Sequence, residues 1–401
     1  MLQLTKEEEE MLNGKRGEGI ARAMEVIVKV AESLDAPRLQ PIRHAHVSGV
    51  SYGTIGEAGA SFLEEIASLG ARVSVPASVN PIGYDPESPN GKGILKIDRK
   101  FMEGQRRILK ALGRMGFTLT LTCTPYYTDF LYSLNLSQGD SVAWGESSAV
   151  AYANTVLGLK TNREGGPLAL MAAITGRTYY SGLHVDENRI PDTEYVYNEP
   201  VDEAVLGVIS EYLAEKHESE RPPLVRTRRR PREYEVREFA AALGAAGSIA
   251  MAVLPGITPL PRRPSISHRD EIDHAWVKSR LSDLKPTVRP DVIFIGCPHT
   301  SYEELAIINK EIQDKVKVPV LITLSRDVYI KAKETGLIES LESKGVTFLR
   351  GTCLIISKTR ELAVATNSYK AYFYLSKKSN IKEVGLQPLP LLMRMARGEE
   401  L

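Results

Sequence analysis

Three cysteines, in a chain of 401 residues, are the side chains with the clearest chemical potential. Cys123 follows "TLTLT", Cys297 follows "IFIG" and Cys353 follows "TFLRGT". Each preceding segment is typical of a β-strand, so we expect each thiol at the carboxyl end of a strand. In open α/β folds ligands bind at that edge, because strands end there and helix N-termini point there. The positions therefore indicate a shared metal or cluster site.

The chemistry of such a site depends on what three thiolates can bind. Thiolates are soft ligands that suit zinc or iron–sulfur clusters, and the wide separations exclude a local CxxC zinc motif. An ordinary iron–sulfur cluster takes four cysteines, so three would leave one iron free to bind a substrate oxygen. Zinc with three thiolates and a water is the competing metal site. Three inert buried thiols are the alternative without a metal.

Two loops rich in small polar residues could supply donors to a substrate. "HVSGVSYG" offers the hydroxyls of Ser48 and Ser51, and Gly49 lets the backbone approach a ligand, with Val50 as a further substrate-binding candidate. "VNPIGYD" offers the amide of Asn80, followed by Pro81. The structural alternatives are a plain Gly/Ser turn and a turn begun by Asn-Pro.

Charged candidates lie at three further places. "WGESSAV" puts Glu146, Ser147 and Ser148 at a predicted helix start, where backbone N–H groups favour an anion. Ser147 could instead be the N-cap, and Glu146 could simply complement the helix dipole. Arg163 in "NREGGP" and Lys370 in "TNSYK" are candidates for a phosphate or carboxylate, against the alternative of surface ion pairs.

Histidines are weaker candidates. His46 and His299 could support cluster sulfurs or hydrogen-bond a substrate, and His184 is a further possibility. A lone histidine is more often structural.

The elements that position the N-terminal candidates alternate between strand and helix. In chain order the pattern predicts a strand in "RHAHV", a helix over 57–69, a strand in "ARVSVPASV", a helix over 101–115 and a strand in "FTLTLTC". "SVAWGESSAVAYANTVLGL" then reads as strand, turn and helix. This alternation favours an α/β architecture with mainly parallel pairing.

The pattern from residue 290 onward indicates a Rossmann-like domain. "DVIFIG", "VPVLITLS" and "GVTFLRGTC" read as strands separated by helices, the first capped by Ser301 with Glu304. No GxGxxG motif follows the first strand. We therefore divide the chain into an N-terminal α/β region, a basic, Pro-rich and small-residue connecting region, and a C-terminal α/β domain, over 1–220, 221–289 and 290–401.

Composition excludes several classes of protein. The chain is 43% hydrophobic and 25% charged, with a formal net charge of +1, so no overall field attracts nucleic acid or an anionic membrane. No long apolar run occurs, and the acidic start "MLQLTKEEEEML" is untypical of a secretory signal. We expect a cytoplasmic protein without a membrane or nucleic-acid partner. The basic stretch "RTRRRPR", residues 226–232, is interpreted as a solvated or partner-facing surface.

The loops and cysteines together resemble those of a known family. "RHAHVSGVSYGTIGEAG", "VNPIGYD", "TCTPYY", "WGESSAV", "NREGGP", "GCPH" and "ATNSYKAYFY" occur in the order found in aconitase X. The resemblance runs from about Leu4 to beyond Tyr374. It implies an aconitase-like fold, with parallel-sheet α/β domains around a central iron–sulfur active-site cleft. One departure is Tyr369, where the family often has glycine, so we expect a different pocket wall.

The resemblance implies a hydro-lyase with a 4Fe–4S cluster held by Cys123, Cys297 and Cys353, one iron not being ligated by cysteine. It also implies catalytic roles for Glu146 and Ser147. In the archaeal branch, the large subunit of a heterodimer dehydrates (R)-5-phosphomevalonate to trans-anhydromevalonate 5-phosphate, in a mevalonate route to isoprenoids. The family's small swivelling domain, sometimes a separate subunit, is thought to bring the base serine. No segment here matches it, so we expect a partner chain.

Two other functions stay open. Dehydration of cis-3-hydroxy-L-proline is the alternative within the family, and its amine substrate would need a carboxylate partner instead of a basic clamp. The alternative from another class is a cluster-containing sensor or binding protein, suggested only by the basic stretch 226–232. Nucleic-acid binding that weakens steeply with salt would favour the sensor.

Overall fold

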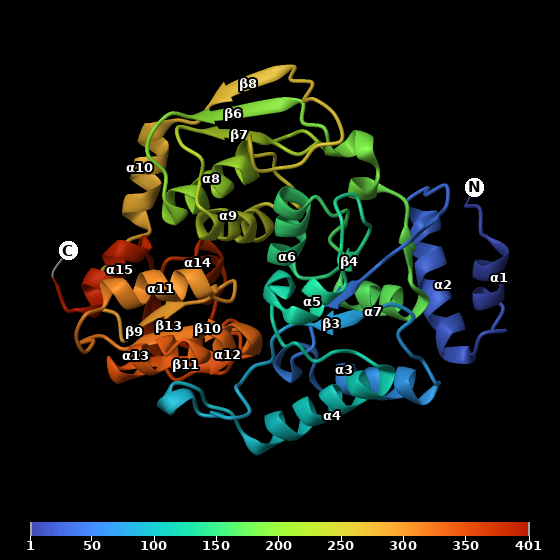
Figure 1. The fold of residues 1–401 in the computed structure, drawn as a ribbon, viewed down its shortest axis with the longest axis horizontal. Helices are drawn as coiled ribbons and strands as arrows, with labels where there is room; N and C mark the ends of the chain where they lie inside the picture. The colour runs from blue at the N-terminus through green and yellow to red at the C-terminus, as the bar shows by residue number, and fades with distance from the viewer. Residues whose placement is uncertain (1, 400–401) are drawn as a thin grey trace.

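The computed structural model describes residues 2–399 and has three parts that follow one another along the chain (Figure 1). Each part contains a parallel sheet, of three, three and five strands, and a further antiparallel pair lies in the first part. The predicted α/β class with parallel pairing is confirmed. No helix of the described residues is long and apolar enough to cross a membrane.

The N-terminal part is built on a three-stranded parallel sheet wrapped by helices. Its elements are α1 (Lys6–Leu12), α2 (Glu18–Ser33), β1 (Leu39–Pro41), β2 (Ala45–Val47), α3 (Tyr52–Ser68), β3 (Ala77–Val79), α4 (Arg99–Met115), α5 (Asp129–Ser133), β4 (Ala143–Trp144), α6 (Ser147–Tyr152), α7 (Gly166–Thr175) and β5 (Arg177–Tyr179). The strand order is β3-β2-β4, while β1 and β5 pair antiparallel. Apolar side chains of α2, α3, α4 and α7 bury the sheet in one core.

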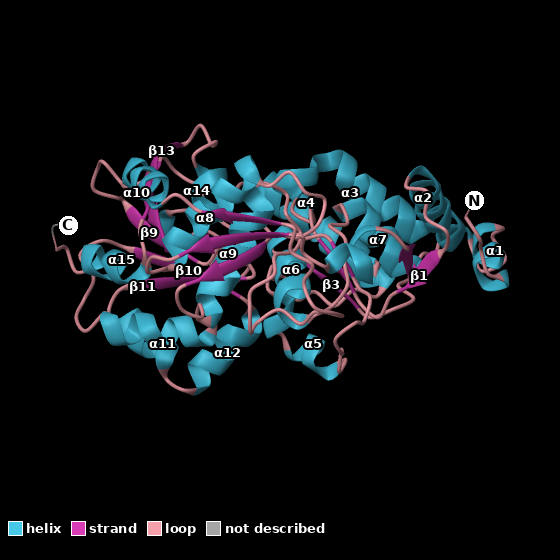
Figure 2. Cartoon of the chain, turned by 90° about the horizontal axis from the view of Figure 1, so that it is seen from above, coloured by secondary structure: helices cyan, strands magenta, loops and turns pink. Residues whose placement is uncertain are grey.

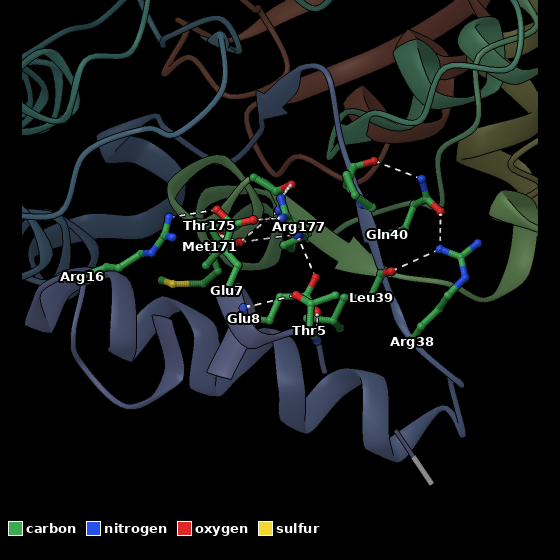
Figure 3. Close-up of polar contacts among 12 residues, drawn as sticks. Thr5, Glu7, Glu8, Arg16, Arg38, Leu39, Gln40, Met171, Thr175 and Arg177 are labelled. Carbon is green, nitrogen blue, oxygen red and sulfur yellow. Dashed lines mark hydrogen bonds and ion pairs between the residues drawn. The ribbon is translucent and has the colours of Figure 1, made fainter. Parts of the chain in front are cut away.

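Helix α1 is fastened to this part by charge (Figure 3). Arg177 of β5 donates to Glu8 at 2.8 Å and to Glu7 at 2.9 Å. Glu8 also accepts from the backbone N–H of Thr5, whose hydroxyl accepts from Glu8 N–H in return, so the two residues form a capping box. These bonds fix the first turn of α1 and attach it to β5.

One predicted strand of the N-terminal part is wrong. Residues 117–122 were expected to form a strand ending near Cys123, but they are extended without forming one. Thr118 N–H donates to Ala77 and Thr122 N–H to Val79, at 2.9 and 3.2 Å. Between them Leu121 has a φ of 49°, which breaks the regular ladder. The segment still runs beside β3, so Cys123 lies at the carboxyl edge of the N-terminal sheet.

The middle part contains a second three-stranded parallel sheet, seen at the top of Figure 1. Its elements are β6 (Thr193–Tyr197), α8 (Glu203–Lys216), β7 (Leu224–Thr227), α9 (Glu233–Ala246), β8 (His268–Glu271) and α10 (His274–Asp283). The strand order is β7-β6-β8, so residues from both sides of position 220 share one sheet. Small residues of α9, such as Ala240 and Ala241, are fully buried. The boundaries set at 220 and 289 stay a prediction.

The C-terminal part is a five-stranded, all-parallel sheet with helices on both sides (Figure 2). Its elements are β9 (Val292–Ile295), α11 (Tyr302–Glu311), β10 (Val320–Leu324), α12 (Arg326–Glu334), α13 (Leu337–Ser343), β11 (Val346–Arg350), β12 (Leu362–Thr366), α14 (Tyr369–Leu375), β13 (Ile381–Leu386) and α15 (Leu389–Ala396). The predicted alternation is confirmed, and Ser301 caps α11 by accepting from Glu304 N–H. The strand order β11-β10-β9-β12-β13 places a topological switch point between β9 and β12, where such sheets bind ligands.

Candidate active site

The carboxyl ends of two parallel sheets meet at one cavity of about 270 Å³. Thirteen of the fourteen predicted site residues line this cavity, namely Ser48, Gly49, Val50, Ser51, Asn80, Pro81, Cys123, Glu146, Ser147, Arg163, Cys297, Cys353 and Lys370. Ser148 lies behind the wall and is buried. Four larger hollows, of about 370, 470, 590 and 710 Å³, contain none of the three cysteines. The cysteines therefore identify the cavity of about 270 Å³ as the candidate active site.

The three cysteines come from two different sheets. Cys297 follows β9 at the switch point, Cys353 follows β11, and Cys123 comes from the extended segment beside β3. All three are free thiols, and burial raises the pKa of each. All three line this cavity, and within residues 2–399 no group of three or more His, Cys, Asp or Glu side chains is placed to hold a metal ion.

Three thiols that line one cavity without being grouped around a single ion fit a larger group, such as a cluster, better than one ion. The backbone N–H of His299 lies 3.2 Å from Cys123 Sγ, and hydrogen bonds to sulfur of this kind help to set the reduction potential of iron–sulfur clusters. The backbone N–H of Cys353 is fixed by the carbonyl of Ile82 at 3.0 Å. A positively charged group would offset the cost of ionising buried thiols, which solvent cannot offset here.

His299 braces the three cysteine-bearing segments and is no ligand itself. Its Nε2 donates to the carbonyl of Thr352, at 2.8 Å, and its Nδ1 lies 2.9 Å from Thr122 Oγ1. These threonines directly precede Cys353 and Cys123, and His299 itself stands two residues after Cys297. Burial lowers the pKa of His299 to about 4, so the ring is neutral and each nitrogen has one role.

Glu146 and Lys370 form a buried ion pair at the cavity wall. Glu146 is the N-cap of α6 and accepts from Ser148 N–H, so the alternative in which Ser147 is only the N-cap is excluded. Lys370 Nζ pairs with Glu146 and donates to Ser147 Oγ at 3.0 Å. Burial alone would raise the pKa of Glu146, but Lys370 and the amide of Asn80 outweigh it and lower that pKa to about 2. The carboxylate is therefore ionised at every physiological pH.

The Ser48–Ser51 loop lies close to its neighbours because glycines face it. A Cβ at Gly145 would lie 2.8 Å from Ser48 Oγ, and one at Gly166 would clash with the Ser48 carbonyl. Gly49 has a φ of 70° with open space beside it. Ser51 caps α3 by accepting from Gly53 N–H, which leaves its hydroxyl hydrogen available.

Arg163 is a cationic side chain of the cavity that has unused hydrogen-bond donors. Only its Nη1 is bonded within the described residues, to the Gly244 carbonyl and to Ser248 Oγ at 3.2 and 3.1 Å. Lys370, in contrast, directs its ammonium at Glu146, Ser147 and Ser148. Arg163 is therefore the better placed of the two to bind an anionic end of a substrate.

Three further expectations concern residues that do not line the cavity. His46 is buried behind it, and His184 bonds Ser141 at 3.1 Å away from it. Tyr369 is buried in the apolar core of α8 and α9, against Gly207, so the expectation that it changes the pocket wall is wrong. Sequence reasoning missed Trp144, which is on β4 beside His46, and His44, which directly precedes β2.

Replacing Gly296 by alanine is expected to destabilise the loop that carries Cys297. Gly296 has a φ of 119°, and a Cβ there would clash with the backbone of Thr323. We expect the free energy of unfolding to fall by about 3 kcal/mol, measured with urea. Gly336→Ala is the control, because that glycine has a φ of 73° and open space, and should cost about 1 kcal/mol. Equal losses would contradict the clash.

Comparison with known proteins agrees with this geometry. Models of the first, second and third domains of aconitase X match residues 1–187, 187–281 and 290–396. The crystal structure of Thermococcus kodakaraensis aconitase X in its holo-form matches with a TM-score of 0.87 and 34% identity, over 98% of this chain and 100% of that one. The chain belongs to the aconitase X family.

Its relatives within the family include enzymes of two kinds. The phosphomevalonate dehydratase large subunit of Aeropyrum pernix is 48% identical over 98% of this chain and 99% of that protein. The protein of the same name from Methanosarcina mazei is 36% identical over 93% of this chain and 92% of that protein. The cis-3-hydroxy-L-proline dehydratase of Pseudomonas aeruginosa is 29% identical over 86% of this chain, which spans 60% of that protein.

Proposed function

We propose that this chain is the large, catalytic subunit of a phosphomevalonate dehydratase. The reaction removes the C2 proton and the C3 hydroxyl of (R)-5-phosphomevalonate as water, leaving a C2=C3 double bond in trans-anhydromevalonate 5-phosphate. The observation that carries the proposal is the cavity, which is lined by two buried thiols, one partly buried thiol and one arginine with unused donors. Near-complete coverage of relatives that bear this name supports it.

Cys123, Cys297 and Cys353 would hold a 4Fe–4S cluster in which one iron has no cysteine ligand. When bound, that cluster supplies a Lewis acid that makes the C3 hydroxyl a feasible leaving group. The rest of the cavity binds and orients the substrate. The fit rests on the shared cavity, the buried thiols and the N–H group of His299 directed at Cys123.

The polar groups of this chain would then each bind a different part of the substrate. Arg163 offers a planar pair of donors to the phosphate or carboxylate. Ser48 and Ser51 offer hydroxyls from a second loop that lines the cavity. Glu146 is a weak base, because its pKa is held at about 2, so its role is to hold Lys370 and the two neighbouring serines in place.

A base for the C2 proton is expected from a partner chain. The relatives are named as large subunits, which supports a small subunit here. We propose that this subunit closes over the cavity and brings the serine base, in the way the family's swivelling domain does. Heterodimer formation would be seen as co-elution of the two chains in gel filtration.

The alternative substrate fits the cavity less well. An amine such as hydroxyproline calls for a free carboxylate, and Glu146 is the only carboxylate among the described cavity residues. Both of its oxygens are occupied, by Lys370 and by Asn80. The test is turnover of 5-phosphomevalonate and cis-3-hydroxy-L-proline by the same reconstituted heterodimer. Exclusive turnover of hydroxyproline would overturn the substrate assignment and keep the family.

The basic stretch gives the sensor alternative little support. Arg226 pairs with Glu194 at 2.7 Å, and Arg229 binds both oxygens of Glu235 at 2.6 and 2.7 Å. Arg232 stands at the start of α9 with its guanidinium beside the Tyr234 ring. These three of the five arginines act within the fold, whereas Arg228 and Arg230 are exposed. Gel-shift titration at low and high salt would test the affinity of this surface for nucleic acid.

Arg163→Gln is expected to raise the KM for 5-phosphomevalonate by roughly 10- to 100-fold while changing kcat less. A hydrogen bond to a charged group contributes about 1.5–3 kcal/mol, and glutamine keeps the size but loses the charge. Steady-state kinetics of the reconstituted heterodimer measure this. Arg43→Gln is the matched control, since Arg43 is exposed and bonds Asp140 outside the cavity. An unchanged KM in the Arg163 variant would contradict the anion clamp.

A further inference from the structure

A row of buried polar side chains lies on one face of the N-terminal sheet, behind the cavity. His46, Ser78 and Trp144 are register partners on β2, β3 and β4. Side chains alternate between the two faces of a strand, so residues two positions away share the same face. The residues two positions away are His44, Asn80 and Glu146, which lie just outside these strands and are joined to the row by hydrogen bonds. The face therefore runs from the buried core of the sheet to the cavity wall.

The row begins at an indole, which fixes the direction of the hydrogen bonds after it. Trp144 Nε1–H can only donate, and it lies 2.9 Å from His44 Nδ1. His44 Nδ1 is thus the acceptor, and the neutral ring carries its proton on Nε2, which lies 3.2 Å from Ser78 Oγ. Burial and the nearby His46 hold the pKa of His44 well below its usual value, which keeps the ring neutral.

The same direction continues to the cavity. Ser78 Oγ accepts from His44 and is left to donate to His46 Nδ1, at 2.8 Å. His46 then carries its proton on Nε2 and donates to Asn80 Oδ1, also at 2.8 Å. With its oxygen occupied, Asn80 turns its NH₂ group toward Glu146, and Nδ2 donates to Oε2 at 2.6 Å.

We propose that Trp144, His44, Ser78 and His46 are positioning residues that form a one-way hydrogen-bond relay and fix the amide orientation of Asn80. The reversed amide would set Asn80 Oδ1 against the Glu146 carboxylate, two acceptors without a proton between them. The relay thereby keeps Asn80 as a donor and holds Glu146 toward Lys370. The kinetic effect of the relay rests on the proposed function, whereas its direction is a property of this chain alone.

Packing alone does not explain this row. Trp144, His44 and His46 have no exposed surface, and Ser78 is 1% exposed. Apolar residues of similar shape would fill the same space at equal or better stability, since replacing both partners of a buried hydrogen bond is often nearly neutral. A fully satisfied polar chain instead specifies one arrangement, which suits the wall of a reaction cavity.

The direction of the relay can be read on the apoprotein. Nitrogen-15 NMR of histidine-labelled protein, which has seven histidines, reports the tautomer of each ring. We expect wild-type His46 to carry its proton on Nε2. Ser78→Ala removes the bond between the two rings, and His46 should then populate the Nδ1 tautomer. Ser78→Thr keeps the hydroxyl and should restore Nε2. Trp144→Phe removes only the first donor and provides a second break if the alanine variant folds poorly.

Kinetics supply the second readout. In the reconstituted heterodimer, Ser78→Ala should lower kcat by about 10-fold at unchanged KM and iron content, with Ser78→Thr close to wild type. An Nδ1 proton on His46 in the wild type would overturn the relay. So would a Ser78→Ala variant with native iron content and wild-type kcat. An Nε2 proton in a protein that does not turn over phosphomevalonate would support the relay and overturn the proposed function.

Discussion

Replacing Cys297 by serine is expected to remove the cluster and the dehydratase activity together while leaving the fold in place. Cys297 is buried at the end of β9, and the Cys297–Pro298 peptide there is cis. Serine has nearly the same shape, so the strand and its neighbours stay packed. A buried hydroxyl does not ionise as a soft thiolate ligand does, so one ligand of three is lost. Iron and sulfide content, visible absorbance and turnover measure the result.

The control for this variant is Thr300→Val in the same loop. The Thr300 hydroxyl is buried and has no hydrogen-bond partner within residues 2–399, so valine removes it at no cost in bonding. The valine variant should keep its iron and its activity. A Cys297→Ser protein with full iron and full turnover would refute the ligand assignment. Equal loss of iron in both variants would show that the loop, and not the thiolate, had been disturbed.

Breaking the Glu146–Lys370 pair is expected to have the second large effect. The two side chains are 14% and 9% exposed, so Lys370→Met leaves a buried carboxylate without its counter-ion. Removing one partner of a buried pair costs about 3–5 kcal/mol. Urea unfolding should show this loss for Lys370→Met and for Glu146→Gln, and turnover should fall about 10²-fold or more in each. The double variant should lose less stability than the two single losses together, and strict additivity would contradict the pairing.

The pH dependence of stability tests the same pair. The pKa of Glu146 is lowered from 4.5 to about 2, so its contribution to folding is complete above about pH 4.5 and is lost as the pH falls toward 2. The pKa of Lys370 is raised, so its contribution is present below its usual pKa and is lost only as the pH rises beyond it. The stability difference between wild-type and Glu146→Gln apoprotein should stay constant from about pH 5 to 10 and shrink below about 4.5. A difference that persists unchanged at about pH 3 would contradict the assignment.

The cysteines show how far strand ends can be predicted from sequence. Cys297 lies past β9 as expected, because an apolar run bounded by Gly296 is a strong local signal. Cys123 reaches the same cavity without its predicted strand, since the left-handed Leu121 interrupts an alternating pattern that otherwise favours one. The local sequence pattern thus predicted correctly that the three thiols lie at one edge, although one of the strands expected to carry them does not form.

Long-range pairing could not be predicted. Glu146 and Lys370 are 224 residues apart, and nothing in either motif indicates that the lysine would serve the carboxylate instead of the substrate. The hydrogen-bond relay behind the cavity has only a weak signature in the sequence. Polar residues alternate in "HAH", "SVN" and "WGE", but strands of two or three residues are too short for a period of two to be recognised.

The most direct test of the central claim is a ⁵⁷Fe Mössbauer spectrum of the anaerobically reconstituted heterodimer, before and after addition of 5-phosphomevalonate. We expect one four-iron cluster per large subunit and a change at one of the four irons, the one without a cysteine ligand, when substrate binds. A protein that retains no iron, or a cluster whose irons are all unaffected by substrate, would contradict it.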